Sequence, residues 1–320
     1  MPIRFTSPSL GGYRLGFIQS NEWEVGISYR RLTADDWFVG SDIEPGQAPG
    51  GKPNIFNIHT IDLSASYGIS DLLSLRLTVP ISTGTNSRIH PDGVRRETSA
   101  TGIGDISLVG TLWLLDPVSH ADGNVAVGLG MKLPTGSNDV MGELGLPGGT
   151  VQHPVHPGLQ LGDGGWGIIL EIQAYQRLVA GLSAYAFLSY LVSPRETSDV
   201  TFSPTSDVLS VPDVYHGRVG LAYSILPDGV LSASLGARVD GIPVRDLVGG
   251  DEGIRSPGYT LFLDPGLAVI WERNTFTVSV PIRMHGEFKK NVGDLRGDPP
   301  TGGRGDLASY LIYLGVTRRL

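Results

Sequence analysis

Acidic and basic residues recur at alternate positions along this chain of 320 residues. Side chains that alternate in this way share one face of a β-strand, and the apolar residues between them occupy the other face. Opposite charges on neighbouring strands pair with one another, and charges that line a pore select the solute that passes. The acids on this face are Glu24, Asp62, Asp105, Glu171, Asp240 and Asp264, and the bases are Arg30, Arg76, Lys132, Arg218, Arg238 and Arg283.

His216 lies deep inside one of these alternating segments, in the order Tyr215-His216-Gly217-Arg218. A hydrolase needs a nucleophile within hydrogen-bond reach of such a base. The position two residues after His216, where a serine nucleophile would suit this chemistry, is Arg218. We therefore expect His216 to bond to Asp240, and we expect the chain to have no catalytic residues and not to be an enzyme.

Metal, nucleotide and nucleic-acid sites find little support in the sequence. His153 and His156 lie close together but have no placed third ligand, so no metal site is expected. The chain has no cysteine, which excludes a disulfide framework and a thiolate zinc site. The glycine-rich run at 162–167 lacks the Lys-Ser/Thr of a phosphate loop. A net charge of −8 does not favour nucleic acid, and we expect no cofactor.

Alternation of apolar and polar residues recurs from Trp23 to the end of the chain, whereas helical periodicity is rare. Trp23, Val25, Ile27 and Tyr29, for example, share one face. The pattern predicts about twelve strands of roughly 9–13 residues, the length that crosses a bilayer at a tilt. The strands predicted in the second half lie near 182–193, 214–225, 230–240, 259–271, 275–285 and 308–318.

The links between these strands alternate between short and long. The short links are 68–71, 116–123, 178–182, 226–229 and 272–274, and the long ones are approximately 33–57, 83–100, 135–163, 194–213, 241–257 and 286–305. Bacterial outer-membrane barrels have short periplasmic turns and long extracellular loops. The sequence therefore predicts an all-β fold with one domain over 1–320. This domain is a closed antiparallel transmembrane β-barrel, with an N-terminal segment over 1–21 and strands over about 22–320.

The expected surroundings follow from this architecture. Outer-membrane lipid and lipopolysaccharide are the predicted partners, and Trp23, Trp166 and Trp271 near strand ends suit the membrane interfaces. No run of 18 apolar residues predicts a transmembrane helix. The first residues lack the apolar core of a signal peptide, so we expect an export leader to have been removed.

In a membrane barrel the polar face lines the lumen. Folding the strands about their short turns predicts that Asp62 lies beside Arg76, Asp105 near Lys132, and Asp264 beside Arg283. A fourth cluster is predicted from His216, Arg218, Arg238 and Asp240. These charges either fill the lumen with salt bridges that hold the strand register or form a selective constriction. A candidate apolar path for a solute consists of Ile169, Tyr175, Tyr185 and Phe187.

Three stretches carry a resemblance to a known family. They are Tyr67-Gly-Ile-Ser-Asp-Leu-Leu73 running to Val79-Pro80, then Gly102-Ile-Gly-Asp-Ile106, then Gly130-Met-Lys-Leu-Pro-Thr-Gly136. Over residues 58–320 the chain resembles the outer-membrane meta-pathway phenol-degradation transporters, which lie near the hydrophobic-compound channels. The resemblance implies a barrel and uptake of small apolar or aromatic molecules. Leu320 departs from the aromatic residue that usually ends such barrels.

The first functional expectation is therefore an outer-membrane channel for passive uptake of small hydrophobic or aromatic solutes. One alternative is a closed, salt-bridged barrel with a structural or surface-interaction role, since twelve strands leave little free lumen once long side chains fill it. The second alternative is an outer-membrane hydrolase. The solute, the gating and the oligomeric state are left open by the sequence.

Overall fold

The computed structural model describes residues 17–90, 92–146, 149–202, 207–226, 229–296 and 302–320. Residues 1–16 of the segment predicted over 1–21 lie outside these ranges. The described chain is mostly β-strand, as its alternation of apolar and polar residues predicts. No helix in the described ranges is long and apolar enough to cross a membrane.

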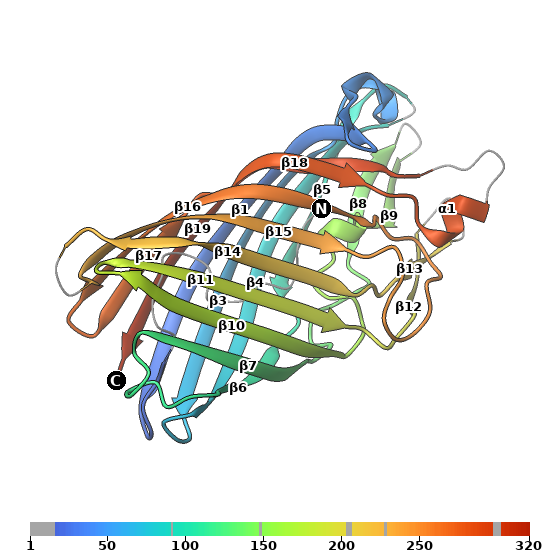
Figure 1. The fold of residues 1–320 in the computed structure, drawn as a ribbon. Helices are drawn as coiled ribbons and strands as arrows, with labels where there is room; N and C mark the ends of the chain where they lie inside the picture. Colours follow the sequence, from blue (N-terminus) through green and yellow to red (C-terminus); the bar gives the residue numbers. More distant parts are fainter. Residues whose placement is uncertain (1–16, 91, 147–148, 203–206, 227–228, 297–301) are drawn as a thin grey trace.

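Twelve antiparallel strand positions form one closed barrel, in which each strand pairs with the next in the sequence (Figure 1). The last strand pairs with the first from Glu24–Arg319 to Val39–Arg304, which closes the barrel. The predicted fold class and strand number are confirmed. The positions are β1 (Trp23–Val39), β3 (Ile55–Gly68), β4 (Leu73–Ile89), β5 with β6 (Arg95–Ile103, Ser107–Trp113), β7 (Gly123–Lys132), β10 (Gly167–Val179), β11 (Leu182–Val192), β14 (Val214–Ser224), β15 (Leu231–Ile242), β16 (Gly258–Trp271), β17 with β18 (Asn274–Ser279, Ile282–Phe288), and β19 (Arg304–Arg319).

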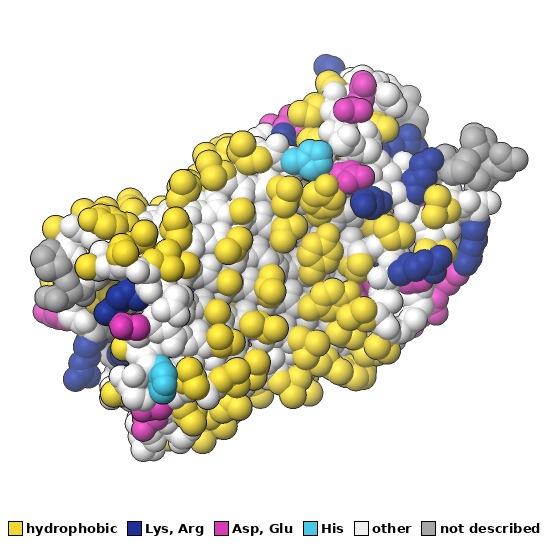
Figure 2. Space-filling view, viewed as in Figure 1, with side chains coloured by type: hydrophobic (Ala, Val, Ile, Leu, Met, Phe, Trp, Pro, Cys, Tyr) yellow, Lys and Arg dark blue, Asp and Glu magenta, His cyan; other side chains and the backbone are white. Residues whose placement is uncertain are grey.

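The outer surface of the barrel is apolar. Large hydrophobic side chains such as Ile27, Leu129 and Leu188 are more than half exposed and point away from the lumen. On the face drawn in Figure 2, hydrophobic side chains cover the wall and charged side chains gather mainly toward its two ends. In a closed barrel the backbone N–H and C=O groups of every strand are hydrogen-bonded to a neighbouring strand, as a bilayer requires. This architecture is that of a bacterial outer-membrane barrel and agrees with the predicted location.

One part of the wall extends well beyond this apolar band. Outward-facing residues of β4 are apolar as far as Ile81, and Thr83 and Thr85 then continue the same face. Strand β4 pairs with β5 up to Ile89–Arg95. The prediction of a long loop over 83–100 is therefore wrong. Ser, Thr and Gly alternate there without a hydrophobic pattern, so apolar alternation could not predict that the hydrogen-bonded pairing continues beyond Ile81.

The other long connections carry small elements of their own. They hold β2 (Asp42–Ile43), the hairpins β8–β9 (Met141–Leu146, Gly149–Pro154) and β12–β13 (Thr197–Phe202, Asp207–Ser210), the single-turn helices η1 (Pro45–Gln47), η2 (Pro49–Gly51) and η3 (Pro157–Leu159), and α1 (Val292–Arg296). Strand β8 contacts β5, so its connection folds back onto the barrel wall. The short turns lie at the opposite end, together with the C-terminus (Figure 1).

Single cysteines introduced into this cysteine-free chain test which end faces outward. Leu247, 68% exposed in the connection after β15, should react with an impermeant maleimide on intact cells when replaced by cysteine. Val118, 66% exposed in a short turn, should react only after the outer membrane is opened. Labelling of the position 118 cysteine on intact cells would reverse the topology.

Candidate functional site

A layer of ion pairs crosses the interior of the barrel. It contains predicted charges from the inner strand faces together with Asp36 and Asp163, which were not predicted. The N–O distances are 2.7 Å for Arg30–Asp62, 3.0 Å for Arg76–Glu171, 3.0 Å for Lys132–Asp105, 2.5 Å for Lys132–Asp163, 2.7 Å for Arg218–Asp264, 2.9 Å for Arg238–Asp240 and 2.5 Å for Arg283–Asp36. We call these residues the charged layer.

Some predicted pairings hold and others do not. The contact between Asp105 and Lys132 is confirmed, and Asp163 joins it from the connection before β10. The pairing of Asp62 with Arg76 is wrong. Asp62 lies opposite Pro80 in the register of β3 and β4, four residues along the strand from Arg76. On its other side Asp62 lies opposite Ser28, within diagonal reach of Arg30.

The pairing of Asp264 with Arg283 is also wrong. A register shift between Leu261 and Phe262 interrupts the pairing of β16 with β18, and Arg283 instead reaches Asp36 on β1. Asp264 lies opposite Gly236 on β15. Because Gly236 has no side chain, Arg218 from the strand beyond it reaches Asp264, so Arg218 does not belong to the predicted fourth cluster.

The remainder of that cluster is present and extends farther than predicted. Nδ1 of His216 hydrogen-bonds to Asp240, and Nε of Arg238 donates to the other oxygen of the same carboxylate at 2.9 Å. Arg238 also donates to the Tyr313 hydroxyl at 2.6 Å. Arg238 is 1% exposed and Asp240 is 2% exposed. A buried ionic network of this kind fixes the relative positions of β14, β15 and β19.

The second alternative, a hydrolase, would need a nucleophile beside His216. Ser189 lies directly opposite His216, which lies directly opposite Asp240. Within the described chain, the Ser189 hydroxyl and Nε2 of His216 form no hydrogen bond with each other or with other groups, and both are buried. Neither residue lines the cavity described below. A nucleophile needs contact with its base and space for a substrate, and this row offers neither.

The predicted apolar path residues all lie inside the barrel but in separate groups. Ile169 packs with Val109 and Leu191, and Tyr175 packs near the short turns with Trp113. Tyr185 lies under the Arg218 guanidinium, 5.1 Å from its ring centre. The Phe187 ring centre lies 5.8 Å from that of His216. Their role in passage stays a prediction.

A cavity of about 590 Å³ lies in the half of the barrel that carries the long connections, and we call it the outer cavity. Its volume falls within the range of small-molecule sites. Lys132, Asp105 and Arg30 of the charged layer border it, and it reaches the exposed residues Pro49 and Arg304. Apolar side chains form much of its wall, namely Trp37, Phe56, Ile58, Leu159, Leu161, Leu191 and Phe288.

One wall of the outer cavity comes from a connection that enters the barrel. An ideal Cβ on Gly84 would lie 3.0 Å from Leu159, and one on Gly102 would lie 2.7 Å from Leu161. The two glycines on the inner faces of β4 and β5 therefore make room for these leucines. Gln160 lies between them in the sequence, and its side chain accepts from the Val140 amide at 2.9 Å and donates to the Val140 carbonyl.

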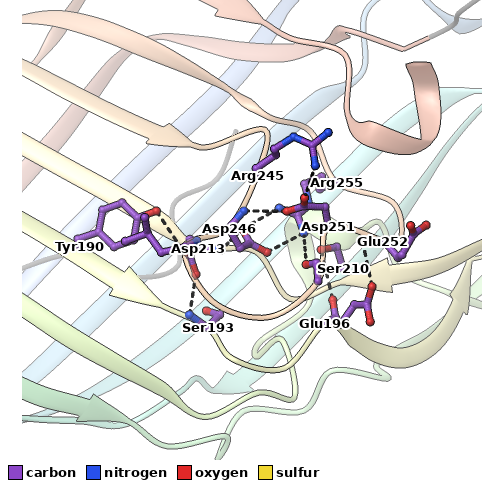
Figure 3. Close-up of polar contacts among 12 residues, drawn as sticks. Tyr190, Ser193, Glu196, Ser210, Asp213, Arg245, Asp246, Asp251, Glu252 and Arg255 are labelled. Carbon is purple, nitrogen blue, oxygen red and sulfur yellow. Dashed lines mark hydrogen bonds and ion pairs between the residues drawn. The ribbon is translucent and has the colours of Figure 1, made fainter. Parts of the chain in front are cut away.

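Another wall rests on a polar network between two connections, the one from β11 to β14 and the one from β15 to β16 (Figure 3). Asp213, 0% exposed, accepts from the Tyr190 hydroxyl at 2.9 Å and from the backbone amides of Ser193 and Leu247. Arg255 donates from both terminal nitrogens to Asp246 at 2.7 Å. Burial raises the pKa of Asp246, although Arg255 opposes the shift. Arg255 and Ser210 carry this network to the outer cavity.

His153 and His156 are both accounted for by local contacts. Nδ1 of His156 accepts from the Gly158 amide at 3.0 Å, and Nδ1 of His153 donates to the Pro154 carbonyl at 2.6 Å. No group of three His, Cys, Asp or Glu side chains in the described ranges has the arrangement of a metal site.

Several solved structures have a similar fold. An outer-membrane channel from Pseudomonas putida F1 is similar, with a TM-score of 0.65 and 13% identity over 99% of this chain and 100% of that chain. Weaker similarities include CymD, a monoaromatic hydrocarbon channel (TM-score 0.46, 10% identity, 95% and 89% coverage). The translocator domain of the autotransporter NalP from Neisseria meningitidis has a TM-score of 0.46, 13% identity and 94% and 90% coverage.

No family model and no curated protein matches the chain. The similarity to the P. putida channel shows a shared barrel fold, because 13% identity does not extend to individual site residues. The phenol-degradation family inferred from the sequence stays a prediction. Sequence reasoning missed the outer cavity, whose walls include residues from the connections that were treated only as external loops.

Proposed function

We propose that this protein is an outer-membrane channel for the passive uptake of small apolar or aromatic solutes. The outer cavity carries the proposal, because it offers apolar walls within a closed barrel that has the fold of an outer-membrane channel. A solute gains about 25 cal/mol for each Å² of apolar surface that it buries there. The enzyme alternative has less support, because among the described residues the Ser189 hydroxyl and the His216 ring form no hydrogen bond with each other and neither residue lines the cavity.

A closed structural barrel is the second candidate, and the charged layer favours it. Its ion pairs bind side chains across the interior below the outer cavity, and buried pairs of this kind leave little room for water. The two candidates differ in conductance. Purified full-length protein in a planar bilayer should show discrete ion currents if it is a channel, and a barrel that passes neither ions nor solutes would support the structural role.

Replacing Phe56 with alanine should reduce the uptake of an aromatic solute. Phe56 is 3% exposed and its ring forms part of the cavity wall. Losing part of its contact with a bound ring costs about 1 kcal/mol, so uptake of benzyl alcohol well below saturation should fall about fivefold. Uptake of a sugar of similar size should change less, since it buries less apolar surface. Flux into proteoliposomes measures both.

Phe276 provides the matched control, because it lies on the lipid-facing side of β17 and is 37% exposed. Phe276→Ala removes the same ring without touching the outer cavity and should leave both fluxes unchanged. Heat-dependent mobility on gels establishes that each variant is folded. Equal loss of sugar and benzyl alcohol flux in Phe56→Ala would point to a distorted barrel and count against apolar recognition.

A further inference from the structure

Strand β4 continues its alternation past the apolar band, with Asn86 and Arg88 at alternate positions on its inner side and His90 directly after its end. Arg88 and His90 line the outer cavity. All three also line a small cavity of about 10 Å³ beside it, together with Arg96 and His153. One end of the outer cavity is therefore surrounded by nitrogen-bearing side chains.

Positive charge is in excess at this end. Arg88 lies directly opposite Arg96 in the register of β4 and β5, an arrangement in which like charges repel. Arg96 is neutralised by Asp92 through contacts of 2.8 and 2.5 Å. Arg88 makes no ion pair or hydrogen bond with any residue of the described ranges. The arginines of the charged layer, in contrast, all contact a carboxylate.

A buried donor beside Arg88, the side-chain amide of Asn86, also lacks a partner among the described residues. The Asn86 side chain is 3% exposed, and within the described part of the chain its Nδ2 donates to no acceptor. The His90 ring lines the outer cavity and forms no hydrogen bond to a described residue. Because buried donors in folded proteins are nearly always paired, the Asn86 amide points to an acceptor that comes from outside the chain.

The apolar wall of the outer cavity begins next to these donors. His156 lines both cavities, and its ring meets the edge of the Phe56 ring with the centres 4.8 Å apart. Leu159 and Ile58 pack around Phe56. A ligand that spans this boundary would place an anionic group among the nitrogens and an apolar body against Phe56.

We propose that the outer cavity binds a small organic anion, a carboxylate with an aromatic or aliphatic body. Its carboxylate contacts Arg88 and Asn86, with His90 beside them, and its body lies against Phe56, Ile58 and Leu159. A guanidinium suits this ligand because its N–H groups match the two oxygens of a carboxylate. The assignment rests on the proposed channel function for its biological use, but the binding site itself can be tested without transport.

Equilibrium binding to the purified full-length protein in detergent tests the site. Calorimetric titration with benzoate, with its neutral analogue benzyl alcohol and with acetate separates the charge from the apolar body. The wild type should bind benzoate about 10- to 100-fold more tightly than benzyl alcohol, and acetate weakly. Arg88→Gln should lower the affinity for benzoate to that for benzyl alcohol, and Arg88→Lys should retain part of the preference for benzoate.

Arg177→Gln is the matched control, because Arg177 pairs with Asp122 near the short turns and its side chain is 53% exposed. It should bind benzoate like the wild type. Equal benzoate affinity in Arg88→Gln, or benzoate bound no more tightly than benzyl alcohol, would overturn the anion site while leaving a channel for neutral solutes intact. Benzoate binding without flux in proteoliposomes would overturn the channel function and leave the anion site standing.

The imidazole at position 90 supplies an independent readout. Burial and the positive charges of Arg88 and Arg96 lower the pKa of His90, His153 adds to this effect, and Asp92 opposes it. A bound anion favours the protonated imidazole, so binding should strengthen as the pH falls. Benzenesulfonate stays ionised throughout and should bind more tightly at pH 5.5 than at pH 8. His90→Gln should flatten this dependence, and an unchanged dependence in that variant would exclude His90 from the site.

Discussion

Replacing Arg218 with methionine should lower the free energy of unfolding by about 3–5 kcal/mol, because it leaves the buried Asp264 carboxylate without its counter-charge. Asp264 is 0% exposed, and the Arg218 Nε lies 2.7 Å from its Oδ2. The N–H does not align with that oxygen as in a hydrogen bond, so the attraction between charges is what the variant removes. Urea unfolding from lipid vesicles, followed by tryptophan fluorescence, measures the loss.

Two further variants decide whether this loss comes from the pair itself. Asp264→Leu in the Arg218→Met background should recover part of the stability, since no buried charge then lacks a partner. Arg283→Met should cost about 1 kcal/mol or less, because the carboxylate of its partner Asp36 is 32% exposed. Equal losses of stability in Arg218→Met and Arg283→Met, with no recovery in the double variant, would show that the buried Asp264 carboxylate is not the cause of the loss.

Asp213→Ala should loosen the outer connections without unfolding the barrel. The carboxylate accepts from Tyr190, Ser193 and Leu247, and each donor left unpaired in a buried site costs about 1–3 kcal/mol. The connections over 193–213 and 243–257 should then open more often. Because 1.4 kcal/mol corresponds to a factor of ten, trypsin cleavage after Arg245 should accelerate about tenfold or more.

Asp139→Ala serves as the control for this experiment. Asp139 is an exposed carboxylate in another connection and accepts from the Ser137 hydroxyl at 2.7 Å. Its loss should leave cleavage after Arg245 unchanged. If Asp213→Ala is cleaved at the wild-type rate, the network in Figure 3 does not hold these connections together.

Strand alternation was sufficient to predict the barrel because lipid and lumen impose opposite polarity on successive residues. Ile27 and Ser28, for example, point to opposite sides of β1 as expected. The ion pairs were harder to predict, since a long side chain can reach a diagonal position on the next strand or extend over a glycine to the strand beyond it. Arg30 reaches Asp62 diagonally, and Arg218 reaches Asp264 over Gly236. Neither contact follows from pairing two strands about their short turn.

The outer cavity was hidden for a different reason. Leu159 and Leu161 reach the lumen because a long connection folds inward onto Gly84 and Gly102, and such long-range docking leaves no periodic signal. Arg88 and His90 were within reach of sequence reasoning. Continuing the inward series of β4 through Ser82 and Gly84 places both on the lumen side, but the polar outward residues there had suggested a loop.

Arg88 lies seven residues beyond Ile81, where the apolar outer surface of β4 ends, or roughly 20 Å along the strand. We call the part of β4 and β5 beyond Ile81 the overhang. Because it lies past the apolar band, its outward residues do not have to suit lipid. Substitutions in the proposed anion site should therefore leave membrane insertion undisturbed. We expect the overhang of β4 and β5, grafted onto another barrel, to carry the ligand preference with it.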